Sequence, residues 1–183
     1  LLLKEYLEDY PETIHHNQLK FLIGSYHFEE KEWDKAIFWF DQANLDYLSV
    51  EEQEDFSFRL AYSDLQAKNY DAAGRLFGLL SLNSNKYKDA GNYYDGYIEY
   101  TKGNYNAALR RFERVAQKPK YKQEVAFYRA QMAFLNGNLE EAINLSEAYV
   151  NRYPNTEHIT EIYRVLGNSY YRLGNTSQAI PYY

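Results

Sequence analysis

The sequence predicts an all-α fold, an α-solenoid of antiparallel helix pairs with about five repeats plus a partial N-terminal one. Alanines recur at separations of 34 to 37 residues, a small residue recurs midway along the helix before each, and a short polar or glycine turn lies between. A period near 34 with helix–turn–helix content is typical of stacked helical repeats. The recurring alanines are Ala36, Ala73, Ala108, Ala142 and Ala179.

Each repeat is expected to contain a first helix, A, and a second helix, B. Residues 1–11 are expected to be the end of a preceding repeat, because Pro11 cannot continue a helix. The five repeats are expected near 17–50, 54–86, 89–120, 123–156 and 160–183. Helix A is expected over 17–30, 51–67, 89–101, 121–136 and 156–173. Helix B is expected over 33–47, 70–82, 105–117, 139–153 and 176–183. No glycine- or serine-rich linker interrupts the series, so we expect one solenoid domain over 1–183. Because both ends cut a repeat, we expect this domain to be a fragment of a longer array.

Three sets of residues are expected to pack the helices. Small residues midway along the A helices let the B helices approach closely, and the recurring alanines do the same from the B side. The small residues are Gly24, Ala61, Gly96, Ala130 and Gly167. Large residues open four of the five B helices, and large residues also stand seven residues after the start of four of them, where they fill the space between repeats. They are Trp33, Tyr70, Tyr105 and Leu139, followed by Phe40, Phe77, Phe112 and Tyr183.

The last repeat carries a recognisable set of residues: Leu166, Gly167, Tyr170, Gly174, Ala179 and Tyr183. With these residues the chain resembles tetratricopeptide repeats (TPR) along its whole length. The resemblance implies a right-handed superhelix. The first three repeats depart from it, with His27, Asp64 and Glu99 where the family favours tyrosine.

Two helix breaks, Tyr-Pro-Glu-Thr at 10–13 and Tyr-Pro-Asn-Thr at 153–156, give a further resemblance. They are similar to those of bacterial envelope TPR proteins, such as BamD-type outer-membrane assembly lipoproteins and the accessory protein of the Tol–Pal system. This resemblance implies a location in the bacterial periplasm or at the periphery of the outer membrane.

The resemblance also implies a binding face, because A helices line the concave groove of such superhelices. One stripe of each A helix should face that groove, at the i, i+4, i+7 spacing that keeps side chains on one face. The expected partner-binding residues are Phe21, Phe28, Phe58, Tyr62, Tyr93, Tyr97, Tyr100, Phe127, Gln131, Phe134, Arg164, Asn168 and Tyr171. Aromatic side chains give large contact area with few rotors to freeze. The alternative is that they pack against neighbouring A helices.

Composition and motifs argue against several classes of function. The net charge of −6 argues against nucleic acid, and no apolar run is long enough for this segment to insert in a membrane. There is no cysteine, phosphate-binding glycine loop or Ser-His-Asp pattern, so we expect no enzyme and no cofactor. Adjacent His15 and His16 point in different directions, so no metal is expected.

The sequence therefore predicts a non-catalytic scaffold whose partner is a protein or peptide segment held in an aromatic-lined concave groove. End-to-end self-association through the open repeat ends is a further expectation. One alternative is a carbohydrate-binding or envelope-assembly lipoprotein component. Carbohydrate binding is considered because exposed tyrosine and tryptophan rings can pack against the faces of sugar rings. A regulatory sensor domain of a larger protein is another.

Overall fold

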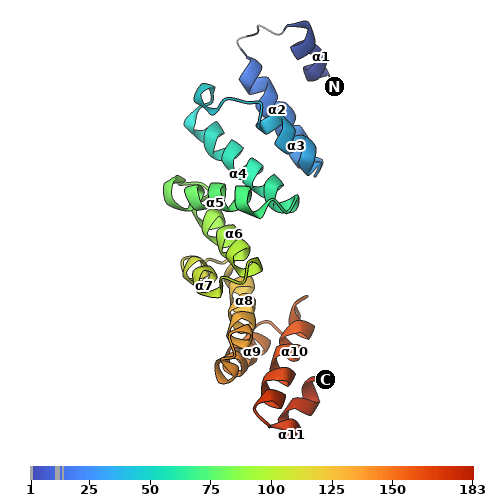
Figure 1. The fold of residues 1–183 in the computed structure, drawn as a ribbon, viewed down its shortest axis with the longest axis vertical. Helices are drawn as coiled ribbons and strands as arrows, with labels where there is room; N and C mark the ends of the chain where they lie inside the picture. Colours follow the sequence, from blue (N-terminus) through green and yellow to red (C-terminus); the bar gives the residue numbers. More distant parts are fainter. Residues whose placement is uncertain (1, 11–12, 14) are drawn as a thin grey trace. The chain divides into compact units, whose positions relative to one another are not determined.

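The protein is known from a computed structural model that describes residues 2–10, 13 and 15–183. Within these residues all regular structure is helical, which confirms the all-α prediction (Figure 1). Pro11 and the break expected there lie outside the described residues. The chain divides into two compact units, residues 1–98 and 99–183. The single domain expected over 1–183 stays a prediction.

The first unit begins with α1 (Leu2–Asp9) and then holds alternating A and B helices (Figure 1). Neighbouring helices pack in chain order, α2 on α3, α3 on α4 and α4 on α5. The elements after α1 are α2 (His16–Glu29), α3 (Trp33–Phe40), the 3₁₀ turn η1 (Leu45–Tyr47), α4 (Val50–Gln66), α5 (Tyr70–Asn83) and α6 (Lys88–Thr101), which continues past the unit boundary.

The second unit repeats the pattern, with α8, α9, α10 and α11 packed in chain order. Its elements are α7 (Tyr105–Glu113), α8 (Lys122–Leu135), α9 (Leu139–Arg152), α10 (Ile159–Arg172), α11 (Thr176–Ala179) and the 3₁₀ turn η2 (Ile180–Tyr182). No described helix combines the length and apolar character that crossing a bilayer requires.

The predicted packing residues lie where helices meet. The five recurring alanines are at most 1% exposed, and Phe40, Phe77 and Phe112 are completely buried. A Cβ added at Gly167 would lie 3.2 Å from the ring of Tyr183, so the predicted close approach is confirmed there. A further close approach, not among those predicted, is at Gly91, where an added Cβ would lie 2.6 Å from the backbone nitrogen of Ser81. Helices α5 and α6 therefore cross at nearly backbone contact.

Five turns join A to B helices with one backbone geometry. In each, a residue with positive φ follows the A helix, and the next residue donates its N–H to a carbonyl five residues earlier. This is the Schellman ending of a helix. The residues with positive φ are Lys31, Lys68, Gly103, Gly137 and Gly174.

In the first three repeats, polar side chains reinforce these turns. Asn69 Nδ2 donates to Asp64 Oδ1 at 3.1 Å, and Asn104 Nδ2 donates to Glu99 Oε2 at 3.0 Å. His27 Nδ1 and Glu32 Oε2 are 2.6 Å apart in the first repeat. His27, Asp64 and Glu99, the departures from the family pattern, thus hold the turn that follows them.

Three B helices end at least four residues earlier than predicted. Helix α3 ends at Phe40, because Asn44 makes a competing local turn by accepting from Asp46 N at 2.9 Å. Helix α7 ends at Glu113, where the backbone bonds tighten to i→i+3 and bring Val115 into the core. The last B helix becomes η2 after Ala179, because Pro181 has no N–H for an i→i−4 bond.

Candidate functional site

The first unit contains a groove lined by aromatic side chains from four helices. It has a volume of about 450 Å³, and its rings are Phe28 from α2, Trp33 from α3, Phe58 and Tyr62 from α4 and Tyr94 from α6. Glu29, Lys31 and Gln66 complete the lining. We call this the aromatic groove. Three of its rings, Phe28, Phe58 and Tyr62, are among the predicted partner-binding residues.

Helix spacing explains why the rings converge. Phe58 and Tyr62 are one turn apart on α4, and their rings stack at 6.0 Å. Tyr62 makes edge-to-face contacts with Phe28 at 5.9 Å and Trp33 at 5.8 Å. Phe58 also stacks on Tyr87 at 4.3 Å, which fixes its orientation. The rings are thus already held in place before any ligand arrives, which lowers the entropy lost on binding.

A cation already lies on this aromatic surface. The guanidinium of Arg59 is 5.0 Å from the centre of the Phe28 ring, and its Nη1 donates to Glu29 Oε1 at 2.7 Å. A guanidinium over a ring face is attracted by the negative face of the π-system. The contact shows that rings of this groove accept a positive side chain, with a carboxylate beside it.

The predicted partner-binding residues do not include Trp33, Tyr94 or Gln66, which also line this groove. Trp33 was predicted to pack between helices, and it does contact Phe28 at 5.8 Å, but it also lines the groove. Tyr94 directly follows Tyr93, the first residue of the predicted stripe on α6, and its ring contacts that of Tyr62 at 5.4 Å. Gln66 continues the Phe58–Tyr62 stripe by one turn, and that spacing could have identified it.

The other predicted residues of the first unit lie outside the groove. Phe21 packs against Phe40 and Phe56, with ring centres 6.3 and 6.2 Å away. Tyr93 contacts Tyr94 edge-on, and Tyr97 packs against the core formed by α4, α5 and α6.

In the second unit, three predicted residues join one hydrogen-bonded chain across the A helices. Tyr100 donates its hydroxyl to Gln131 Oε1 at 3.3 Å, and Gln131 Nε2 donates to Glu161 Oε1 at 3.0 Å. Arg164 Nε donates to Glu161 Oε2 at 2.9 Å, and this bond is the main reason that the pKa of Glu161 is lowered. Gln131 is only 6% exposed, so it stabilises the A-helix stack.

The remaining predicted residues are dispersed. Phe127 is 7% exposed and stacks on the ring of His158 at 4.0 Å, so little of it is available to a partner. Phe134 lies under the guanidinium of Arg172 at 5.3 Å, and Asn168 Oδ1 accepts from the Tyr183 hydroxyl at 2.9 Å. Tyr171 is exposed and contributes to no pocket described above.

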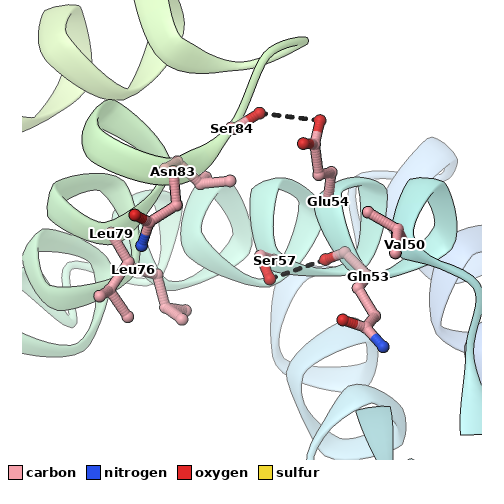
Figure 2. Close-up of a pocket in the computed structure, with 9 residues that line it drawn as sticks. Val50, Gln53, Glu54, Ser57, Leu76, Leu79, Asn83 and Ser84 are labelled. Carbon is pink, nitrogen blue, oxygen red and sulfur yellow. Dashed lines mark hydrogen bonds between the residues drawn. The ribbon is translucent and has the colours of Figure 1, made fainter. Parts of the chain in front are cut away.

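A second pocket of the first unit lies between α4 and α5 (Figure 2). It has a volume of about 250 Å³, and we call it the leucine pocket. In Figure 2, Val50 and Gln53 come from α4, and Leu76 and Leu79 come from α5. At its edge, Glu54 Oε2 accepts from the Ser84 hydroxyl at 2.8 Å, and this bond contributes most to the lowered pKa of Glu54.

One group of described side chains has donor atoms close enough to share a metal ion. Atoms of Glu124, Glu157 and His158 lie within 4.8 Å of one another. His158 Nε2 is 2.9 Å from Glu124 Oε2, whereas the Glu157 side chain is 83% exposed. Together with the stacking on Phe127, the His158–Glu124 contact links α8 to the residue that precedes α10.

Part of the chain matches a known protein family. Residues 93–156 match the family model described as tetratricopeptide repeat. No curated protein sequence gives a significant match.

Three solved structures show the same fold. A crystal structure of MamA has a TM-score of 0.72 and 14% identity, over 87% of this chain and 90% of that one. A tetratricopeptide repeat protein from Parabacteroides merdae has a TM-score of 0.70 and 15% identity, over 98% and 68% of the two chains. The C-terminal part of a TPR repeat-containing protein from Cytophaga hutchinsonii has a TM-score of 0.69 and 20% identity, over 88% and 61%.

Proposed function

We propose that this chain, which is built of tetratricopeptide repeats, is a scaffold that binds a segment of a partner protein in the aromatic groove. Tetratricopeptide repeats are in general protein–protein interaction scaffolds. The observation that supports this site is the groove itself, in which Trp33, Tyr62 and Tyr94 meet beside a polar edge. Fixed aromatic rings beside polar groups are the usual composition of an energetically dominant interface patch.

Charge favours a basic partner segment. Of the 26 aspartate and glutamate residues in the chain, 18 lie in residues 1–98, together with only 9 of the 20 lysine and arginine residues. The resulting negative potential attracts positive segments and raises their association rate. Because Arg59 already lies on Phe28, we expect a lysine or arginine of the partner to contact the neighbouring rings, with an apolar side chain beside it.

A random peptide library selected on the full chain tests this proposal. Selected peptides should be rich in lysine and arginine, and Tyr62→Ala should weaken their binding at least tenfold, which corresponds to about 1.4 kcal/mol. Tyr171→Ala is the matched control, because this tyrosine is 62% exposed and lies outside the groove. Affinities follow from fluorescence anisotropy, and circular dichroism checks that each variant is folded.

Two results would contradict the proposal. One is a set of peptides that bind equally well to the wild type and to folded Tyr62→Ala. The other is a glycan array that gives Tyr62-dependent binding when no peptide does, which would favour the carbohydrate-binding alternative.

A further inference from the structure

The second unit has a pocket at the same place in the repeat as the leucine pocket, but with different chemistry. It lies between α8 and α9 and has a volume of about 190 Å³. Seven lining positions of the leucine pocket recur in it 69 residues later, which corresponds to two repeats. The pairs are Gln53 with Lys122, Ser57 with Ala126, Leu76 with Leu145, Leu79 with Ala148, Leu80 with Tyr149, Asn83 with Arg152 and Ser84 with Tyr153.

Positive side chains surround this second pocket. Lys122 and Arg129 from α8 and Arg152 from α9 line it, and none of its lining residues is acidic. We call it the basic pocket. Arg152 lies over the ring of Tyr153 at 5.6 Å, which keeps its guanidinium at the edge of the pocket. Within residues 2–10, 13 and 15–183, no carboxylate forms an ion pair with any of the three cations.

The inner surface of the basic pocket is apolar. Val125 and Tyr149 are each 1% exposed and form its base, and Leu145 and Ala148 line its α9 side. Ligand pockets for drug-sized molecules usually hold roughly 300–1,000 Å³, so this volume suits a single apolar side chain better than a cofactor.

We propose that the basic pocket binds an acidic segment of a protein, which inserts one apolar side chain and places its flanking carboxylates against Lys122, Arg129 and Arg152. Arginine suits this task because its planar fork of N–H groups matches the two oxygens of a carboxylate. The site differs from the aromatic groove in its unit, its position on the helix pair and the charge of its ligand. Charge complementarity selects the acidic segment, since a basic one would meet three uncompensated cations.

The probe is a fluorescein-labelled peptide in which leucine alternates with aspartate and glutamate, and its anisotropy is measured with the full chain. The double variant Arg129→Gln/Arg152→Gln should weaken binding at least tenfold. The matched control Arg110→Gln/Arg172→Gln removes the same charge from the same unit outside the pocket, and it should change the affinity less than twofold.

A second variant tests whether the peptide inserts into the pocket. Ala148 is exposed on α9, and Ala148→Gln should fill the pocket without changing the charge. We expect it to weaken binding at least threefold while the circular dichroism spectrum stays unchanged. The proposal is overturned if both double variants weaken binding equally, because attraction would then be unspecific. An unchanged affinity in folded Ala148→Gln, or no binding of the peptide to the wild type, overturns it as well.

Discussion

Gly24 lies directly against the ring of Phe40, so closely that a Cβ at residue 24 would be 2.7 Å from two ring carbons. The ring cannot move aside easily, because it is completely buried and contacts the rings of Phe21 and Phe56. This pair fixes the separation of α2 and α3 at the centre of the first repeat.

Gly24→Ala should therefore destabilise the protein by about 1–3 kcal/mol, the usual range for overpacking a filled core. The control is Gly78→Ala in α5, where an added Cβ would meet nothing within 4 Å. The free energy of unfolding of that variant should rise by about 0.5–1 kcal/mol, because alanine is more favourable than glycine in a helix interior. Urea unfolding followed by circular dichroism measures both. Equal effects of the two variants would contradict the packing described for Gly24.

The turn after α4 predicts a stabilising substitution. Lys68 has a φ of 64°, whereas Gly103 has a φ of 79° at the equivalent place. A left-handed backbone is unfavourable by about 1–2 kcal/mol for a residue with a Cβ. Lys68→Gly should then raise the free energy of unfolding by about 0.5–1 kcal/mol, after the added chain entropy of glycine is subtracted. Gly103→Lys should lower it. Thermal unfolding of both variants checks the sign, and a loss of stability in Lys68→Gly would show that its side chain has another role.

Asp64, near the end of α4, predicts a pH-dependent effect. Burial raises the pKa of this carboxyl above its ordinary value of 3.8, although the hydrogen bond from Asn69 opposes the shift. Its contribution to stability is therefore largest below the unfolded-state pKa and is lost as the pH rises through the folded-state pKa. Asp64→Asn should raise the melting temperature at pH 7, and the gain should vanish near pH ~3, where the carboxyl is protonated in both states.

Asp55→Asn is the matched control on the same helix. Asp55 Oδ1 accepts from Lys86 Nζ at 2.6 Å and from the Tyr87 hydroxyl at 3.0 Å, so its charge is compensated. That variant should lower the melting temperature at pH 7. A lower melting temperature for Asp64→Asn would show that the ionised carboxylate is needed to hold the turn.

Tyr170 and Glu147 form a hydrogen bond between α10 and α9, with the hydroxyl 2.7 Å from Glu147 Oε1. This bond is the largest cause of a pKa of about 12 for Tyr170. Tyr170→Phe should lower the free energy of unfolding by about 1 kcal/mol at neutral pH. The bond stabilises the fold below the ordinary tyrosine pKa of 10.0 and is lost as the pH rises through 12. The difference in the free energy of unfolding between variant and wild type, measured by urea unfolding, should shrink as the pH rises from 10.0 to about 12.

The helix pairs could be predicted because their determinants are local and repeated. Ala36 and Ala108 mark the start of B helices, and the turns at Gly137 and Gly174 need a left-handed residue, so spacing alone locates them. The ends of the B helices were less predictable. Asn44 ends α3 by forming a turn with Asp46, and a competing side-chain bond of this kind leaves no periodic signal.

The binding face was only partly predictable. Periodicity predicts on which face of its own helix a side chain lies. It does not predict which residues of the neighbouring helices cover that side chain. Phe127 stands at the same position in its repeat as Phe58 does two repeats earlier, yet the ring of His158 from the next repeat covers it. The basic pocket was missed for a related reason, since Arg129 and Arg152 come from different helices and meet only when α8 and α9 pair.

The position of Trp33 gives the protein a built-in optical reporter. The sequence contains two tryptophans, and only Trp33 lines the aromatic groove. In a Trp39→Phe variant all tryptophan fluorescence would come from Trp33 in the aromatic groove. The neighbouring Tyr62 would transfer excitation energy to it. The arrival of a partner would then change the emission wavelength without any attached dye.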